Sequence, residues 1–381
     1  MKLKVMVLAI ILSFSLVFAS PFLDWGRVYQ KDGSQQIYYV TAGFNGIYLV
    51  GSTSDSPYNE SVLAMKIDED GNVLYERVLN ESPSDWGIGG FETFDDNFMV
   101  VGTTKASGMF YDFYLAKLGA DEFRKPIKNF GTDKATAAIE FVDGYYILGH
   151  STDPQSLNSR GRLIKIDKET HEIILDAWLP NFKPGIDVNP LSIELTADGN
   201  FIIVGTIINY FTSGSEFYMT KVNLKGEEIW TKVFNGKDMN YSRGFQVAEA
   251  EDGYIAVGFT GSWKNGWSDV YLVKYDFDGN LLWERILEND GSDRGYSVKI
   301  AKDGKIYVAG YTTREGNRMT VLYEFDHRGF LLNEHLLGGT GLDVIYSMDI
   351  CNDGNLYLAG FTTSKEYNVV ERDVIVLKYS F

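Results

Sequence analysis

Short apolar runs that end in glycine recur along the chain, about 50 residues apart. The runs end at Gly51, Gly102, Gly149, Gly205, Gly258, Gly310 and Gly360. A run without polar alternation is typical of a strand that is buried on both faces. Alternating apolar and polar segments surround each run, so each repeat predicts four short antiparallel strands. Seven such repeats predict an all-β fold, a seven-bladed β-propeller with four antiparallel strands per blade.

The repeat at residues 295–337 shows the pattern clearly, with strands expected at 295–301, 305–313, 319–326 and 330–337. Asp-Gly pairs between strands favour two-residue type I′ turns, in which both central residues have positive φ. These pairs lie at Asp70-Gly71, Asp143-Gly144, Asp198-Gly199, Asp252-Gly253, Asp278-Gly279 and Asp353-Gly354. The segments DEDGN and DFDGN at two such turns lack the distal ligands of a calcium loop, so no metal site is predicted.

The strand count at the two ends of the chain is complementary. The last repeat stops at its third strand, residues 373–381, and lacks a fourth. Residues 22–33, which precede the first repeat, match residues 281–291, a fourth strand with its exit loop. We therefore expect the N-terminal strand to complete the last blade and close the ring of a single domain, residues 20–381.

Residues 1–19 have the character of a secretory signal peptide. Lys2 and Lys4 precede an uncharged apolar run from Val5 to Phe18, and Ala19 ends a plausible cleavage site before Ser20. The alternative is a retained membrane anchor, although the run is short for a spanning helix of about 20 residues. The sequence thus predicts an extracytoplasmic protein, whether periplasmic, on the cell surface or secreted.

The formal net charge is −17, and loss of Lys2 and Lys4 with the signal peptide makes it more negative. Such a surface repels phosphate groups, so neither nucleic acid nor an anionic membrane surface is an expected partner. The single cysteine, Cys351, forms no intrachain disulfide and is expected to be a small packed residue. No cofactor is predicted.

Acidic residues recur before the first strand of several repeats and at the start of the third. The first set, the acidic rim, is Asp85, Asp133, Asp187, Asp293 and Asp343, and the second is Asp112, Asp269, Asp373 and Glu216. In an up-and-down blade both positions lie on the same face. One interpretation is that each carboxylate accepts hydrogen bonds from loop amides. The other is a rim that attracts cations.

Aromatic residues that break the repeat pattern gather in the long loops on that same face. The candidates for binding a ligand or partner are Trp263, Trp267, Tyr210, Phe211, Tyr241 and Trp86. Exposed loop aromatics often contact a sugar, peptide or protein surface. The alternative is that they cover the ends of the blades.

Third-strand lysines also repeat, at Lys66, Lys117, Lys165, Lys221, Lys274 and Lys378. They are expected to have buried stems and paired ammonium groups, and Glu324 at the same position predicts a rearranged contact. No catalytic motif stands out, because the four histidines lie in different repeats and no nucleophile elbow is present. Acids that meet across the ring remain open as catalytic groups.

The repeats resemble those of secreted bacterial and archaeal β-propeller repeat proteins. The match is close at residues 338–364 (GGTGLDVIYSMDICNDGNLYLAGFTTS) and at residues 268–283 (SDVYLVKYDFDGNLLW). The element Asp276…Gly279…Trp283 also looks like the docking motif of quinoprotein-type propellers. The resemblance implies the propeller fold and a role at the cell surface or envelope, without a defined activity.

The leading hypothesis is a non-catalytic binding module that takes a protein or carbohydrate ligand. The alternatives are a glycan-acting hydrolase or lyase that uses acids at the central funnel, and a structural subunit of a surface assembly. A deep funnel with two close carboxylates favours the enzyme, whereas an aromatic face favours binding.

Overall fold

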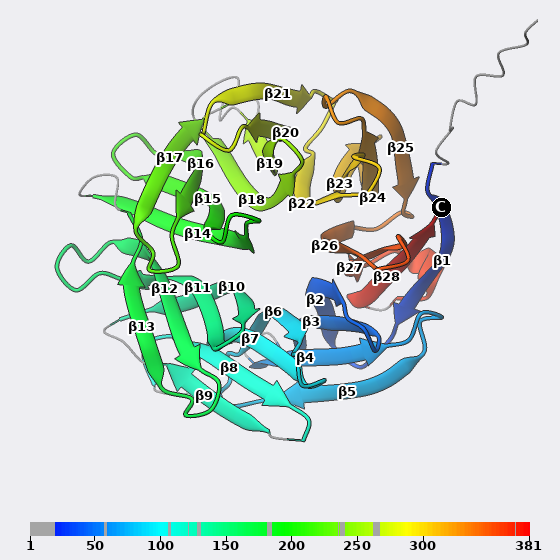
Figure 1. Ribbon diagram of the computed structural model, residues 1–381. Helices are drawn as coiled ribbons and strands as arrows, with labels where there is room; N and C mark the ends of the chain where they lie inside the picture. The colour runs from blue at the N-terminus through cyan, green and yellow to red at the C-terminus, as the bar shows by residue number, and fades with distance from the viewer. Residues whose placement is uncertain are drawn as a thin grey trace, which may run out of the picture.

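The computed structural model (Figure 1) describes residues 20–56, 59–105, 108–120, 122–127, 131–180, 185–234, 236, 241–261, 267–369 and 371–381. Regular structure in these ranges is β-strand apart from one 3-10 turn at Lys365–Tyr367, which confirms the all-β prediction. Within the same ranges, no helix has the length and apolar character needed to span a bilayer.

The strands pair in chain order into four-stranded antiparallel units. The first unit contains β2 (Ser34–Ala42), β3 (Ile47–Ser56), β4 (Asn59–Ile67) and β5 (Val73–Leu79). The second contains β6 (Trp86–Glu92), β7 (Phe98–Thr104), β8 (Asp112–Leu118) and β9 (Phe123–Ile127). The third contains β10 (Asp133–Phe141), β11 (Gly144–Thr152), β12 (Ser159–Asp167) and β13 (Ile173–Trp178).

The following units have the same order. They are β14 (Ile186–Leu195), β15 (Phe201–Asn209), β16 (Gly214–Val222) and β17 (Glu228–Phe234); β18 (Tyr241–Ala250), β19 (Gly253–Gly261), β20 (Ser268–Tyr275) and β21 (Leu281–Leu287); and β22 (Arg294–Ile300), β23 (Ile306–Arg314), β24 (Asn317–Phe325) and β25 (Leu331–Leu337). A single parallel bridge between Ser215 and Tyr241 joins β14–β17 and β18–β21 into one sheet.

The last sheet contains both ends of the described chain. It combines β26 (Asp343–Ile350), β27 (Leu356–Thr362) and β28 (Asp373–Ser380) with β1 (Phe22–Tyr29) as its outer strand. β1 runs antiparallel to β28 from the pair Phe22–Ser380 to the pair Tyr29–Val374, which confirms the predicted pairing.

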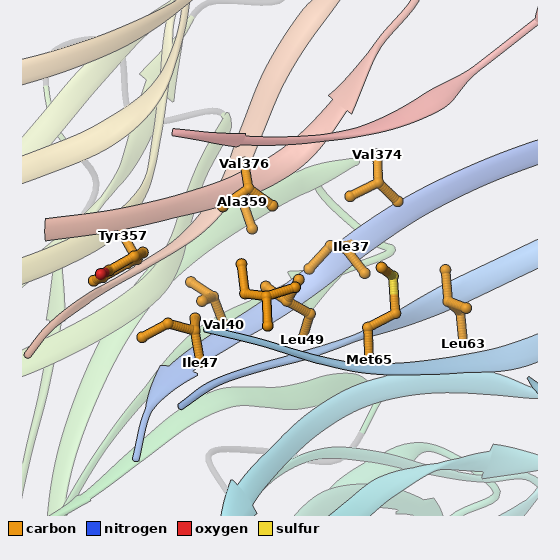
Figure 2. Packing of buried hydrophobic residues seen from close by; sticks show 11 residues of the cluster. Ile37, Val40, Ile47, Leu49, Leu63, Met65, Tyr357, Ala359, Val374 and Val376 are labelled. Carbon is orange, nitrogen blue, oxygen red and sulfur yellow. The ribbon is translucent and has the colours of Figure 1, made fainter. Parts of the chain in front are cut away.

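The sheets are arranged around a common centre, with the first strand of each unit innermost and the fourth outermost (Figure 1). This arrangement is consistent with a β-propeller. Apolar clusters fill the space between neighbouring sheets, including the first and the last. Figure 2 shows Leu49 and Met65 of the first sheet beside Ala359 and Val376 of the last.

Two faces of the molecule follow from the strand order. Segments entering a first strand hydrogen-bond to the start of the preceding unit's third strand, as in Asp85 N to Glu60 O at 3.0 Å and Asp133 N to Tyr111 O at 2.8 Å. The second-to-third connections and the entries to the first strands therefore share one face, here called the loop face. The tight turns lie on the opposite, turn face.

The turns differ from the predicted type I′ geometry. Gly71 has φ of +79°, but Asp70 is not among the described residues with positive φ. Gly71 N donates to Asp68 O and Asp68 N donates to Asn72 O, both at 3.0 Å. The chain thus makes a type I turn followed by a left-handed glycine. The prediction was wrong because the Asp68 side chain holds this wider turn, accepting from Asn72 N at 2.7 Å.

The repeated glycine within each second strand has a packing reason. A Cβ at Gly258 would lie 1.8 Å from the carbonyl oxygen of Arg243, and one at Gly360 would lie 1.9 Å from that of Val344. In each case the close atom belongs to the adjacent first strand of the same sheet. Only glycine allows the two backbones to approach so closely.

Outer-strand tryptophans link neighbouring units. The indole N–H of Trp25 donates to Glu69 O at 3.1 Å, and that of Trp230 donates to Phe277 O at 3.1 Å. Each acceptor lies in the turn between the third and fourth strands of the next unit. Trp283 packs in the same way over Gly329. This contact gives a structural reason for the Gly…Trp spacing in the sequence.

Candidate functional site

The first strands surround a central cavity of about 640 Å³. Each first strand contains a β-bulge, at which one residue has no partner in the neighbouring second strand. In every case this residue lines the cavity. These residues are Tyr38, Ile88, Thr136, Leu191, Phe245, Tyr296 and Tyr346. Because a bulge re-aims one side chain of a strand, it turns a residue of every unit toward the centre.

The cavity wall is asymmetric. Four adjacent units contribute aromatic rings in a continuous arc: Phe245 and Tyr296 have centroids 4.7 Å apart, Tyr296 and Tyr346 5.1 Å, and Tyr346 and Tyr38 5.4 Å. The remaining three units contribute Ile88, Thr136 and Leu191. One side of the cavity is therefore aromatic with phenolic hydroxyls, and the other is aliphatic.

A second tier of rings lies behind this arc. It consists of the residues that follow the repeated glycine in three units, Phe259, Tyr311 and Phe361. Phe259 lies 5.7 Å from Phe245, Tyr311 6.0 Å from Tyr296, and Phe361 5.9 Å from Tyr346.

Guanidinium groups stack on the second tier at strand ends that open on the loop face. Arg294 lies 4.4 Å from the centroid of Phe259, and Arg318 lies 4.2 Å from that of Tyr311. Arg372 lies 4.2 Å from that of Phe361, and Arg243 lies 5.5 Å from the nearby Tyr241. Together the arc, the second tier and these arginines form the arginine–aromatic cluster.

These arginines are not neutralised by nearby carboxylates of the described chain. No ion pair within 4.0 Å involves Arg243, Arg294, Arg318 or Arg372 among the described residues. The Nε atoms of Arg243, Arg294 and Arg318 are buried without a hydrogen-bond partner there. Arg372 donates to Gln36 Oε1 at 2.8 Å. A buried donor without a partner is uncommon in folded proteins.

The cavity is charged toward the turn face. Lys299 pairs with Asp349 at 2.7 Å, and the Glu249 amide donates to Glu194 Oε1 at 3.3 Å. Burial raises the pKa of Glu194, while Lys299 opposes that shift. For Lys299, burial lowers the pKa but Asp349 outweighs it, so the net shift is upward. A carboxyl group with a raised pKa in a cavity is a feature of acid–base sites.

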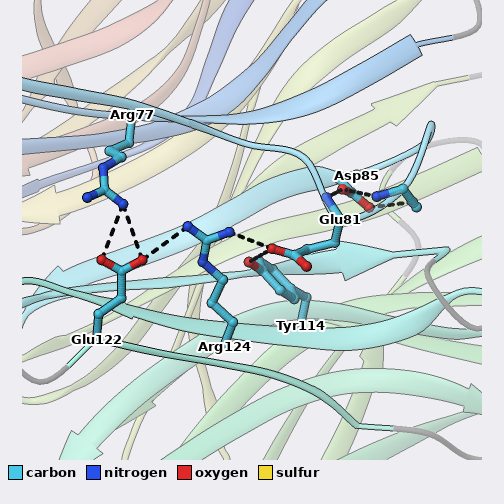
Figure 3. Close-up of polar contacts among 7 residues, drawn as sticks. Arg77, Glu81, Asp85, Tyr114, Glu122 and Arg124 are labelled. Carbon is cyan, nitrogen blue, oxygen red and sulfur yellow. Dashed lines mark hydrogen bonds and ion pairs between the residues drawn. The ribbon is translucent and has the colours of Figure 1, made fainter.

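The acids of the predicted rim occupy different environments. Asp85, Asp133, Asp293 and Asp343 are buried, whereas Asp187 is partly exposed. Asp85 accepts from the Glu81 and Ser82 amides at 2.6 and 2.8 Å (Figure 3).

Asp293 accepts from Thr313 N at 2.8 Å, and Asp343 from Gly339 N at 2.9 Å. Arg162 lies 3.7 Å from Asp133. Asp85, Asp293 and Asp343 thus accept from backbone amides as capping predicts, whereas Asp133 faces a guanidinium group; cation binding at the acids stays a prediction.

The predicted binding aromatics fall into separate groups. Tyr210 and Phe211 are exposed on the loop after β15, where the Tyr210 hydroxyl donates to Asp187 Oδ2 at 2.8 Å. Trp267 is also exposed, just before β20. Trp263 lies outside the described residues.

The other two predicted aromatics are partly buried. Trp86 stacks on Tyr111 at 5.0 Å, with the ammonium of Lys134 5.8 Å from the Trp86 ring. Tyr241 packs against Phe259 at 5.1 Å, so Tyr241 adjoins the arginine–aromatic cluster.

The loop residues singled out from the sequence do not include the arginine–aromatic cluster, although the sequence contains a signal for it. Arg-Gly-aromatic occurs at 243–245 and again at 294–296. In addition, the residue after the repeated glycine is aromatic only in the last three repeats. What the sequence does not display is the bulge that turns these residues inward.

Among the described residues, no group of three or more His, Cys, Asp or Glu side chains is placed to hold a metal ion. His150 is partly buried, and desolvation lowers its pKa to about 4. Its Nδ1 lies 2.7 Å from Ser159 Oγ. Cys351 is partly buried, and burial raises the pKa of its thiol to about 12, as suits a packed residue.

No protein-family model matches the chain, and no curated protein matches it. Among solved structures, puromycin hydrolase superposes with a TM-score of 0.55 at 13% identity, over 87% of this chain and 50% of that one. Sqt1 from Chaetomium thermophilum gives 0.51 at 11% identity, over 88% and 83%. BBS1N, solved in complex with ARL6DN, gives 0.50 at 9% identity, over 94% and 96%. Identities this low show the fold alone, and these propeller-like proteins differ in function.

Proposed function

We propose that this chain is an exported, seven-bladed β-propeller closed by β1, which serves as a non-catalytic binding module at the cell envelope or outside the cell. The pairing of β1 with β28 and the apolar packing between first and last sheets support the closed ring. The resemblance to secreted repeat propellers and the apolar segment at residues 1–19 support export.

The exposed aromatics of the loop face carry the binding proposal. Phe211 is 84% exposed, Tyr210 63% and Trp267 53%. Aromatic side chains are frequent anchors of binding surfaces, because they bury much apolar area at low entropic cost. The arginine–aromatic cluster opens on the same face and adds a concave element to it.

Binding is tested with purified protein, residues 20–381, on a panel of immobilised polysaccharides, peptidoglycan and envelope proteins. Phe211→Ala and Trp267→Ala are expected to weaken binding about tenfold or more, as the loss of an anchor does. Phe44→Ala is the matched control, since Phe44 is 88% exposed but lies in the turn between β2 and β3 on the turn face. Equal losses for all three variants, or none, contradict a binding surface on the loop face.

Export is tested independently by sequencing the N-terminus of the protein isolated from the envelope or medium of its host. We expect the mature chain to begin at Ser20. Recovery of the whole protein from the cytoplasm with Met1 in place contradicts export and leaves the binding test unaffected.

A second candidate function is a glycan-acting hydrolase or lyase, favoured by Glu194 in the cavity. Burial in the cavity raises the pKa of this carboxyl group, as it does for general acids in buried sites. Release of reducing ends or unsaturated products from a polysaccharide, abolished in Glu194→Gln, would establish that activity. Unchanged polysaccharide with the wild-type protein, at concentrations where it binds, rejects it.

A further inference from the structure

We propose that the arginine–aromatic cluster binds an oligosaccharide containing uronic acid, with its carboxylates on the guanidinium groups and a sugar ring against the aromatic arc. This inference rests on the proposed binding function and names a ligand class for it.

The charge distribution is the first support. The chain carries a formal net charge of −17, yet Arg243, Arg294, Arg318 and Arg372 gather on one part of the loop face. The Nε atoms of Arg243, Arg294 and Arg318 have no hydrogen-bond partner within the described chain. Planar guanidinium groups bind carboxylates through paired N–H donors, and stacking on rings holds them in place for this. An anionic ligand therefore fits here, although the protein as a whole repels anions.

The shape and chemistry of the arc are the second support. Phe245, Tyr296, Tyr346 and Tyr38 follow one another around the cavity wall, and the three tyrosines add phenolic hydroxyls to this aromatic surface. A sugar ring presents an apolar face of C–H groups and a rim of hydroxyls, so it matches such a wall. Polar groups of Gln246, next to Phe245 on β18, and of Thr136 and Ser192 on the strands outside the arc line the same cavity. Its volume of about 640 Å³ is within the range of small-ligand sites.

The combination distinguishes this ligand from other anions. An acidic peptide without aromatic residues would use the arginines but has no ring to occupy the arc, and a neutral sugar would use the arc but not the arginines. An acidic saccharide uses both parts of the cluster.

The test is calorimetric titration of the protein, residues 20–381, with trigalacturonic acid, with cellotriose as the neutral trisaccharide and hexaglutamate as the acidic peptide. We expect trigalacturonic acid to bind at least about tenfold more tightly than either, and its affinity to fall when salt is raised from about 0.05 to about 0.5 M. Arg294→Gln and Arg318→Gln are each expected to weaken it about tenfold. Tyr296→Ala should weaken both saccharides.

Arg328→Gln is the matched control, because the Arg328 side chain is 67% exposed in an outer turn, paired with Asp326 at 3.0 Å. Since the arginines pack on rings, the melting temperature of each variant is measured too. Arg294→Lys keeps the positive charge but removes the planar guanidinium group, so it tells the contribution of charge from that of the paired N–H donors. No binding of trigalacturonic acid, equal binding of cellotriose, or arginine-dependent binding of hexaglutamate at equal affinity would each overturn the proposal. If it fails while Phe211→Ala and Trp267→Ala still weaken binding on the panel, the binding module stands with a different ligand.

Discussion

Single residues in this fold are selected mainly by how closely backbones approach. The repeated glycine within each second strand is not a turn residue. A carbonyl oxygen of the adjacent first strand lies where its Cβ would be. A glycine in the turn before β27 has the opposite character. Gly354 has φ of +95° and nothing within 4 Å of its Cβ position. A steric clash therefore excludes other residues at the second-strand glycines, whereas the positive φ disfavours them at Gly354.

This difference predicts unequal costs for the same substitution. Gly360→Ala should destabilise the protein by more than about 3 kcal/mol, because its Cβ meets a backbone atom at 1.9 Å and the sheet has to separate. Gly354→Ala should cost only about 1 kcal/mol, the strain of a left-handed alanine. Urea denaturation of the two variants measures both values. Similar costs would show that the second-strand backbones move apart easily.

At the scale of elements, a repeated ion pair connects the third strand to the turn between first and second strands. Lys117 pairs with Asp95 at 2.5 Å, and Lys221 with Asp198 at 2.6 Å. Where Glu324 replaces the lysine, Lys305 from the same turn faces it at 2.7 Å, so the charges exchange places. The rearranged contact expected at Glu324 is therefore confirmed.

These pairs predict a loss of stability in acid. Burial raises the pKa of Asp95, but hydrogen bonds led by that from Lys117 outweigh it and lower the pKa to about 2. Asp198 behaves in the same way with Lys221, and its pKa is also lowered to about 2. Because the pKa is depressed in the folded state, this stabilisation is present above the unfolded value of about 3.9 and is lost as pH falls toward 2.

Melting temperatures between pH 5 and about pH 2 measure the effect. The double variant Asp95→Asn, Asp198→Asn should be less stable than the wild type at pH 5 and should lose less on acidification. Asp70→Asn, at an exposed turn residue, is the control and should follow the wild type. Parallel curves for the double variant and the wild type would contradict the assignment.

The elements were more predictable from sequence than the candidate site. Four strands per repeat and the pairing of residues 22–29 with β28 both follow from local pattern and strand count. The turn type did not, because an aspartate side chain two residues before Asp70 decides it. The cluster could not be predicted from the sequence either. A β-bulge in each first strand decides which side chain faces the cavity, and the sequence around Tyr296 and Ser297 does not mark the position of the bulge.

At the scale of the whole molecule, the pairing of β1 with β28 brings the two ends of the described chain into one sheet. β1 covers the outer edge of β28, and Trp25 and Arg27 continue the contact to the turn at Gly71 and Asn72 of the first sheet. Removing β1 exposes the full edge of β28 and takes away the contacts of Trp25 and Arg27 with the first sheet, while the apolar packing of the first sheet on β27 and β28 stays.

We therefore expect a variant that begins at Asp32 to melt at least about 10 °C below the protein of residues 20–381, by loss of several kcal/mol. Removing only Phe381, which is exposed, is the control and should have little effect. Differential scanning calorimetry measures both. An unchanged transition in the shorter variant would show that the ring does not depend on β1.

The same pairing sets an order of events during folding. Phe22 finds its partner at Ser380, so a strand synthesised early stays without its neighbour until the rest of the sheets exist. Such a contact carries a large loop-closure entropy and is expected to form late. A circular permutant that joins Phe381 to Ser20 by a short linker, with new ends in the connection near Gly291, would turn this distant contact into a hairpin. Because Phe22 already lies opposite Ser380, the permutant should keep the native structure and refold faster than the original chain.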